Sequence, residues 1–165
     1  MKITYFIVLF VCLSGAVRAQ LSALPVERVD SVMAEQPKPL LILLSTDWCQ
    51  YCRLQKHQLA KNEEFLGKRN LFHYVEFDAE TKDPIQFDGQ QYVFKPTGNK
   101  TGIHELAVAL NGEGTIAFPT WVLLDQEFNP LFRHKGALAP SQIQELIVAI
   151  EQHESNSQKP NNDNQ

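Results

Sequence analysis

The chain has 165 residues, a formal net charge of −4 and hydrophobic side chains at 44% of its positions. This length is typical of one globular domain. The acidic balance argues against a nucleic-acid partner, and the sequence contains neither a basic run nor a Gly-rich phosphate loop.

The first 19 residues have the features of a secretory signal peptide. Lys2 supplies a positive charge, residues 3–13 are a nearly unbroken apolar run, and Val17-Arg18-Ala19 resembles a small-residue cleavage site. The run is shorter than the roughly 20 residues of a membrane-spanning helix, so we expect cleavage before Gln20. Cleavage removes two basic residues and no acid, which lowers the net charge from −4 to −6. The mature protein is therefore expected to be periplasmic or secreted, where disulfides persist.

We expect the mature chain to form one domain over residues 20–153. Residues 154–165 contain no apolar side chain and are predicted to be a disordered tail. Within the domain, apolar residues at helical spacing predict a first helix over residues 24–36. A short apolar run over residues 40–44 predicts a buried strand.

Helix-compatible residues then extend over 53–61, and Asn62 is predicted to cap a short helix over residues 63–68. Alternating side chains predict a second strand over residues 71–77. The pair Asp88-Gly89, with β-prone residues on both sides, predicts an inserted β-hairpin within residues 83–100 that ends in a loop.

The C-terminal part is predicted to hold two helices and another hairpin. The first helix covers residues 103–110 and ends at Asn111-Gly112. Strands over residues 121–124 and 131–134 form the hairpin. The last helix carries apolar residues spaced i, i+3, i+4 and i+7, namely Ile143, Leu146, Ile147 and Ile150.

Cys49 and Cys52 are the two cysteines expected in the mature protein, because Cys12 lies in the predicted signal peptide. The pair follows the buried strand and opens the next helix. Free backbone N–H groups and the helix dipole at such a position favour a thiolate over a thiol. A second cysteine one turn later can close a disulfide with the first, which is what thiol–disulfide exchange requires.

Two other uses of this cysteine pair are a zinc site and a purely structural disulfide. A zinc site needs four ligands, and the sequence has no second C-x-x-C and no closely spaced histidine pair. A purely structural disulfide would close a very short loop, and the stability gained grows with loop length. Redox chemistry is therefore favoured.

Three separated motifs resemble those of the thioredoxin family. They are Trp48-Cys49-Gln50-Tyr51-Cys52-Arg53 after a buried strand, Phe118-Pro119-Thr120 at the start of a strand, and Lys135-Gly136-Ala137-Leu138 before the last helix. The resemblance covers residues 24–153 and is greatest to exported bacterial thiol–disulfide oxidoreductases. It implies an α/β, thioredoxin-like fold with a mixed central sheet flanked by helices, and makes the hairpin an insertion.

The resemblance also implies roles for these residues. Cys49 would be the exposed nucleophile that attacks a substrate disulfide, and the more buried Cys52 would then attack Cys49 to release the reduced product. The chain departs from the family where a buried acid often takes the proton of the second cysteine. That position is Leu43 here, so the proton would move through water or Glu76.

Five further residues are implied to bind substrate, namely Trp48, Tyr51, Phe118, Pro119 and Gly136. Trp48 would shape the docking surface, Pro119 would be cis and face the cysteines, and Phe118 would pair with an extended substrate segment. Gly136 would let that segment approach. Without the resemblance, Trp48 could be a core aromatic and Gly136 a β-bulge.

We expect an exported monomer that reduces protein disulfides. We further expect a membrane or soluble redox partner and no cofactor or metal. The dipeptide Gln50-Tyr51 differs from the Gly-Pro of thioredoxin itself, and a Tyr there also occurs in some isomerases, so the direction of electron flow stays open. One alternative is a Cu(I)-handling metallochaperone using Cys49, Cys52 and a histidine. The other is a non-catalytic interaction module that binds through residues 83–100.

Overall fold

The computed structural model describes residues 21–99 and 101–157. The predicted signal peptide over residues 1–19 and the residues after Ser157 lie outside this part. None of the helices described is both long enough and apolar enough to cross a membrane.

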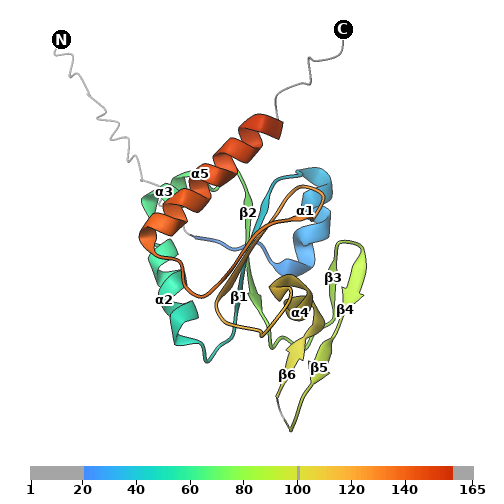
Figure 1. The fold of residues 1–165 in the computed structure, drawn as a ribbon. Coiled ribbons are helices and arrows are strands. Elements are labelled where there is room, and N and C mark those ends of the chain that lie inside the picture. Colours follow the sequence, from blue (N-terminus) through green and yellow to red (C-terminus); the bar gives the residue numbers. More distant parts are fainter. Residues whose placement is uncertain (1–20, 100, 158–165) are drawn as a thin grey trace, which may run out of the picture.

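A four-stranded mixed sheet forms the centre of the molecule, in the order β2-β1-β7-β8 (Figure 1). β1 (Leu40–Ser45) is parallel to β2 (His73–Asp78) and antiparallel to β7 (Thr120–Leu124), which pairs with the edge strand β8 (Pro130–Lys135). β1 has a neighbour on each side and is buried along its whole length. A strand in this position must be apolar on both faces, which explains its continuous apolar sequence.

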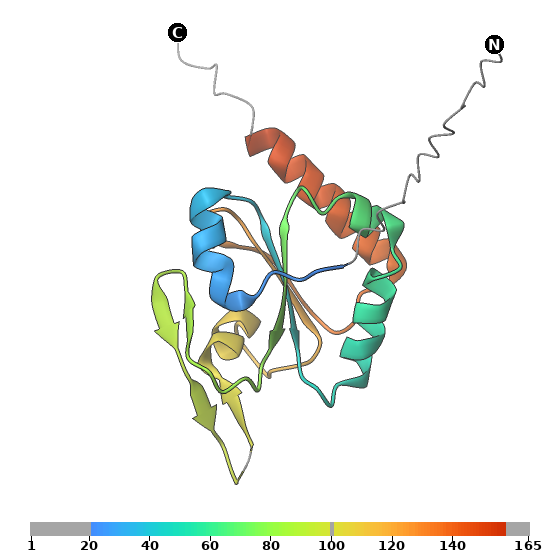
Figure 2. The same ribbon diagram turned by 180° about the vertical axis from the view of Figure 1, so that it is seen from behind.

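Helices cover both faces of the sheet (Figures 1 and 2). One face carries the 3₁₀ turn η1 (Val26–Arg28), α1 (Val29–Glu35) and α4 (Glu105–Asn111), and the other carries α2 (Gln50–Leu59), α3 (Glu63–Gly67) and α5 (Pro140–Ser157). Alternate residues of β1 supply the two cores, because successive side chains of a strand point to opposite faces. Ile42 packs with α1 and α4, whereas Leu41 and Leu43 pack with α3 and α5.

The thioredoxin-like α/β fold with a mixed, helix-flanked sheet is thus confirmed, and the hairpin predicted over residues 121–124 and 131–134 is present as β7 and β8. The predicted start of the disordered tail at residue 154 is wrong, because α5 continues to Ser157. The Glu154 carboxylate accepts a hydrogen bond of 2.8 Å from the Gln126 side chain. The Ser155 hydroxyl donates to the Glu151 carbonyl at 2.8 Å. These polar contacts hold the last turn without apolar packing.

The insertion contains the predicted hairpin. β3 (Ile85–Phe87) pairs with β4 (Gln90–Tyr92) around Asp88 and Gly89, which have φ of +50° and +68°. Two consecutive positive φ values are typical of the turn that this sequence pair favours. Both carboxylate oxygens of Asp30 accept the N–H groups of this turn, at 2.7 and 3.0 Å.

A second hairpin follows where a loop and the start of a helix were predicted. β5 (Phe94–Pro96) pairs with β6 (Gly102–His104), and we call these two strands the arm (Figure 1). The prediction of a helix from residue 103 is wrong by two residues, since α4 begins at Glu105. Gly102 is one cause, because a Cβ there would lie 2.3 Å from Cζ of Phe94. Glycine leaves room for the Phe94 ring across the paired strand.

Candidate active site

Cys49 and Cys52 form a disulfide with an S–S distance of 2.04 Å and a Cα–Cα distance of 5.3 Å. Cys49 is the N-cap of α2, and its Sγ accepts the backbone N–H of Cys52 at 3.1 Å. The N-terminal end of the helix therefore points its N–H groups at this sulfur. When the disulfide is reduced, the same groups would stabilise a Cys49 thiolate.

The expectation that Cys49 is exposed is wrong for the disulfide form. Cys49 is 4% exposed and Cys52 is 1% exposed. The Cys49 sulfur is bonded to Cys52 and lies over the first turn of α2, which leaves it little open surface. The order of exposure is as expected, with the first cysteine the more accessible of the two.

An exposed aromatic residue directly precedes each of the two cysteines. Trp48 is 64% exposed and Tyr51 is 68% exposed, and the nearby Leu54 on α2 is also exposed. Trp48 is therefore not a core aromatic. Exposed large apolar side chains can mark a contact region, and these three lie within five residues of Cys49 in the chain.

Trp48 connects the cysteine turn to the predicted proline motif. Its indole ring meets the Phe118 ring edge-on, with the centroids 6.1 Å apart. The Phe118–Pro119 peptide is cis, as expected, and Pro119 is buried. The indole N–H of Trp48 donates to a carboxylate oxygen of Glu80 at 3.2 Å. Sequence reasoning missed Glu80, which lies in a loop and carries no local signal of this contact.

Gly136 lies directly after β8 and contacts the proline motif. Its backbone N–H donates to the Pro119 carbonyl at 2.8 Å. Gly136 has φ of +118°, a conformation that residues with a Cβ rarely adopt. The nearest atom to a Cβ built there, Nε2 of His134, is 3.8 Å away. Backbone conformation rather than crowding therefore explains this glycine, and the irregularity in the β7–β8 pairing lies elsewhere, at Leu123 and Leu124.

Gln55 completes the connection between the three motifs, and sequence reasoning missed it. Its side chain is fully buried on α2, and Oε1 accepts the backbone N–H of Leu138 at 2.6 Å. Its Nε2 donates to Gln58 at 3.3 Å. The signal that could have found it is a polar residue on the inward face of the helix, three positions after Cys52. Gln55 joins the cysteine helix to the segment that begins at Gly136.

Leu43, at the position where the family often has a buried acid, is buried and lies opposite Glu76 in the β1–β2 pairing. The Glu76 carboxylate lies 3.0 Å from the Lys56 ammonium on α2 and accepts the Tyr74 hydroxyl at 3.0 Å. Burial, together with the negative charge of Glu76, raises the pKa of Tyr74 above its usual range. Tyr74 therefore stays neutral and donates. Glu76 reaches the cysteine helix through Lys56, and its role as proton acceptor stays a prediction.

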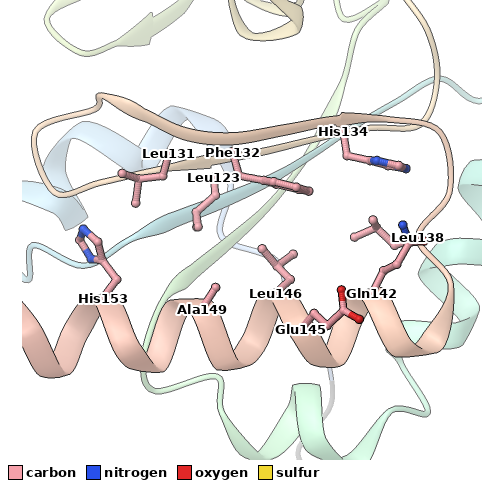
Figure 3. Close-up of a pocket in the computed structure, with 10 residues that line it drawn as sticks. All are labelled: Leu123, Leu131, Phe132, His134, Leu138, Gln142, Glu145, Leu146, Ala149 and His153. Atoms are coloured by element: carbon pink, nitrogen blue, oxygen red, sulfur yellow. The ribbon is translucent and has the colours of Figure 1, made fainter.

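A groove of about 390 Å³ lies between β8 and α5 (Figure 3). Its lining is mainly apolar, with Phe132 from the strand and Leu146 from the helix, and His134 and His153 stand toward its ends. It contains neither cysteine. The disulfide lies instead beside exposed Trp48, an arrangement suited to a disulfide presented by a larger molecule.

No group of three His, Cys, Asp or Glu side chains in residues 21–99 and 101–157 is arranged to hold a metal ion. His104 is fully buried and serves the fold, because its Nδ1 accepts the N–H of Leu106 at 3.2 Å and caps α4.

Residues 27–151 match a family model described as a thioredoxin-like domain. No curated protein matches the chain. Among solved structures, the chain is similar to a DsbH oxidoreductase, with 20% identity over 81% of this chain and 86% of that chain and a TM-score of 0.54. It is also similar to chloroplastic thioredoxin z, with 18% identity over 81% and 96% of the two chains and a TM-score of 0.51. It is similar to Fasciola hepatica thioredoxin as well, with 15% identity over 76% of this chain and 96% of that chain and a TM-score of 0.50. At these identities the structures show a shared fold, and the family match over most of the chain shows that this protein belongs to the thioredoxin-like family.

Proposed function

We propose that this protein is an exported thiol–disulfide oxidoreductase that reduces disulfides in other proteins. The observation that carries the proposal is the Cys49–Cys52 disulfide at the N-terminus of α2, next to the Trp48–Phe118 contact. The signal-peptide pattern of residues 1–19 supports export to the periplasm or the exterior. Protein substrates are supported by the exposed apolar side chains around the pair.

The reaction begins with the reduced protein. The Cys49 thiolate attacks one sulfur of a substrate disulfide, so that a bond forms between Cys49 and that sulfur while the other substrate sulfur leaves as a thiolate. Cys52 loses its proton to water or Glu76 and attacks the Cys49 sulfur, which closes the Cys49–Cys52 disulfide and releases the second substrate thiolate. The substrate gains two electrons and, from solvent, two protons. A partner dithiol must then reduce the Cys49–Cys52 pair.

The direction of electron flow follows from the reduction potential of the Cys49–Cys52 pair. We expect a value near that of thioredoxin, about −270 mV, which is typical of a reductase. Equilibration of the purified protein in glutathione or dithiothreitol buffers, read by mass after alkylation, measures it. A value near about −120 mV would mean that the protein oxidises its substrates instead.

Variants of the two cysteines test the proposed roles. Cys49→Ser should abolish reduction of insulin by the protein with dithiothreitol as electron donor, because it removes the attacking sulfur. Cys52→Ser should leave the first step and accumulate covalent mixed disulfides, visible on a non-reducing gel. Turnover by the Cys49→Ser protein equal to that of the unmodified protein would overturn the proposed function.

A further inference from the structure

The loop over residues 113–118, here called the proline loop, leads from α4 to the cis-proline motif, and Lys135 holds its first half. Lys135 is the last residue of β8. Its ammonium group donates one hydrogen bond to the Glu113 carbonyl and one to the Thr115 carbonyl, each at 2.8 Å. Hydrogen bonds from a charged donor are stronger than neutral ones. One side chain therefore ties two points of the loop to the end of a sheet strand.

The second half of the proline loop is held through its carbonyls as well. The Ala117 carbonyl accepts the Thr120 hydroxyl at 2.7 Å, from the first residue of β7. The Pro119 carbonyl accepts the N–H of Gly136 at 2.8 Å. Alternate carbonyls from residue 113 to residue 119 thus accept hydrogen bonds from β7, from β8 and from the residue after β8. Carbonyls that alternate in this way are typical of an extended chain.

The first half of the proline loop has little else to order it. It follows Gly112 and contains Gly114, with φ of +70° and +82°. Glycine has wide conformational freedom, and ordering it costs entropy. Residues 113–115 are exposed. In the part of the chain that the structure describes, their hydrogen bonds are those from Lys135. The order of this half of the loop therefore depends on Lys135.

The proline loop ends at the aromatic contact beside the cysteines. The Phe118 ring meets the Trp48 ring edge-on, with the centroids 6.1 Å apart, and Trp48 directly precedes Cys49. Phe118 is half-buried and packs against the core on the α1 and α4 face of the sheet. A shift of the loop would move the Phe118 ring relative to Trp48. It would therefore change the surface next to the reactive pair.

We propose that Lys135 is a positioning residue for the binding of substrate proteins. It acts through the proline loop, whose order places Phe118 beside Trp48 before a substrate arrives. A surface that is already ordered loses less conformational entropy on binding, so Lys135 lowers the substrate concentration needed for half-saturation. Its two loop contacts go to carbonyls and not to a cysteine, so the chemical step does not depend on it. The inference rests on the proposed reduction of protein disulfides and adds a residue to it.

Lys135→Met tests this role, because it keeps an apolar stem and removes the donor. The pre-reduced protein is mixed with increasing concentrations of insulin, and its single-turnover oxidation is followed by mass after alkylation. We expect the half-saturating insulin concentration to rise about tenfold and the limiting rate to stay within about twofold. The rate with 5,5′-dithiobis(2-nitrobenzoate), a small disulfide, should also stay within about twofold. Lys135→Arg keeps a cationic donor and should restore most of the loss for insulin.

Arg133→Met is the matched control. Arg133 lies two positions earlier on β8 and on the same face of the sheet. Its Nε donates to the Leu110 carbonyl at 2.9 Å, which lies in α4 and not in the proline loop. Both variants remove one positive charge, so a general effect of charge would appear in both. Arg133→Met should leave the half-saturating insulin concentration within about twofold.

Nuclear Overhauser effects between the Trp48 and Phe118 rings test the positioning directly and need no substrate. They should weaken in Lys135→Met and persist in Lys135→Arg and in Arg133→Met. Urea unfolding checks that each variant is folded. If Lys135→Met does not fold, Lys135→Gln, which keeps a polar side chain without the charge, takes its place in both experiments.

Three results would overturn the inference. They are an unchanged half-saturating insulin concentration in Lys135→Met, an equal increase in Lys135→Met and Arg133→Met, and ring contacts in Lys135→Met as strong as those in the unmodified protein. Failure of the unmodified protein to reduce either disulfide would instead overturn the proposed function. The ring contacts would then still report whether Lys135 orders the proline loop.

Discussion

Gln55 shows how one buried side chain holds the site together. An apolar residue would fit the inward face of α2, but the carboxamide of Gln55 accepts the N–H of Leu138, which is otherwise buried. Leu138 follows Gly136, whose N–H is bonded to Pro119. The cysteine helix and the proline motif are therefore each hydrogen-bonded to the segment 136–138, which leads into α5. Loss of the acceptor would leave a buried donor without a partner, which is costly.

We expect Gln55→Leu to lower the free energy of unfolding by about 1–3 kcal/mol, the usual cost of an unsatisfied buried group. Urea denaturation followed by circular dichroism measures this change. Gln58→Ala is the matched control, because it removes only the partly buried partner of the same carboxamide. It should cost less than about 1 kcal/mol. Equal stability of Gln55→Leu and the unmodified protein would show that the Leu138 contact contributes nothing.

The start of α4 depends on the neutral form of a histidine. His104 caps the helix by accepting the Leu106 N–H with Nδ1, and its ring meets Phe77 edge-on at 5.4 Å. Burial lowers the pKa of His104 below its usual 6.5, and the Asp83 carbonyl and the Glu105 carboxylate oppose this effect. A protonated Nδ1 cannot accept the Leu106 N–H, so protonation removes the cap.

The pH dependence of stability follows from this shift. Because the folded protein binds the proton of His104 less readily than the unfolded chain, the contribution of His104 is fully present above pH 6.5 and is lost as the pH falls through the lower pKa of the folded state. We expect the urea midpoint to fall between pH 6.5 and 5. His104→Asn keeps a capping oxygen that does not titrate, so its midpoint should change less over this range. The same pH dependence in both proteins would contradict the assignment.

The elements that could be predicted from the sequence are those set by local patterns. The apolar run of β1, the Asp88-Gly89 turn and the Asn62 cap each follow from neighbouring residues, and each is present. The cysteine pair at the start of α2 follows in the same way. The site was predictable to the extent that its motifs have their own sequence signals.

The remaining features depend on contacts between distant residues. Gln55 and Leu138 are 83 positions apart, and no local pattern joins them. The arm depends on Gly102 accommodating the Phe94 ring across a strand pair, whereas glycine read along the chain indicates a loop. The low exposure of Cys49 depends on the disulfide itself. Tertiary contacts therefore account for each of these differences.

At the scale of the molecule, the two cores lie on opposite faces of one sheet, and the disulfide follows the C-terminal end of its strand β1. The arm projects from the body at the end where β1 leads into α2 (Figures 1 and 2). Stable disulfides persist mainly in oxidising compartments. Export is the part of the proposed function that rests on the pattern of residues 1–19 alone.

Expression of the full chain in a bacterium should yield a periplasmic protein that begins at Gln20, as read by N-terminal sequencing and intact mass. The physical reason is that residues 3–13 have the length and apolarity of a signal core. Val8→Arg, which interrupts this run, is the control and should leave an uncleaved product in the cytoplasm. A cytoplasmic, uncleaved product from the unmodified chain would contradict export.

The hydrogen bond from Gly136 to the Pro119 carbonyl limits which backbone groups remain for binding a substrate protein. That oxygen already accepts one hydrogen bond within the protein, and the proline nitrogen has no hydrogen to donate. An extended substrate segment can then pair with the backbone of Phe118. Backbone pairing of this kind does not depend on the side chains of the substrate. Under the proposed function, this backbone contact would be independent of substrate sequence, and discrimination between substrates would come from side chains around it, such as the exposed Trp48 and Tyr51.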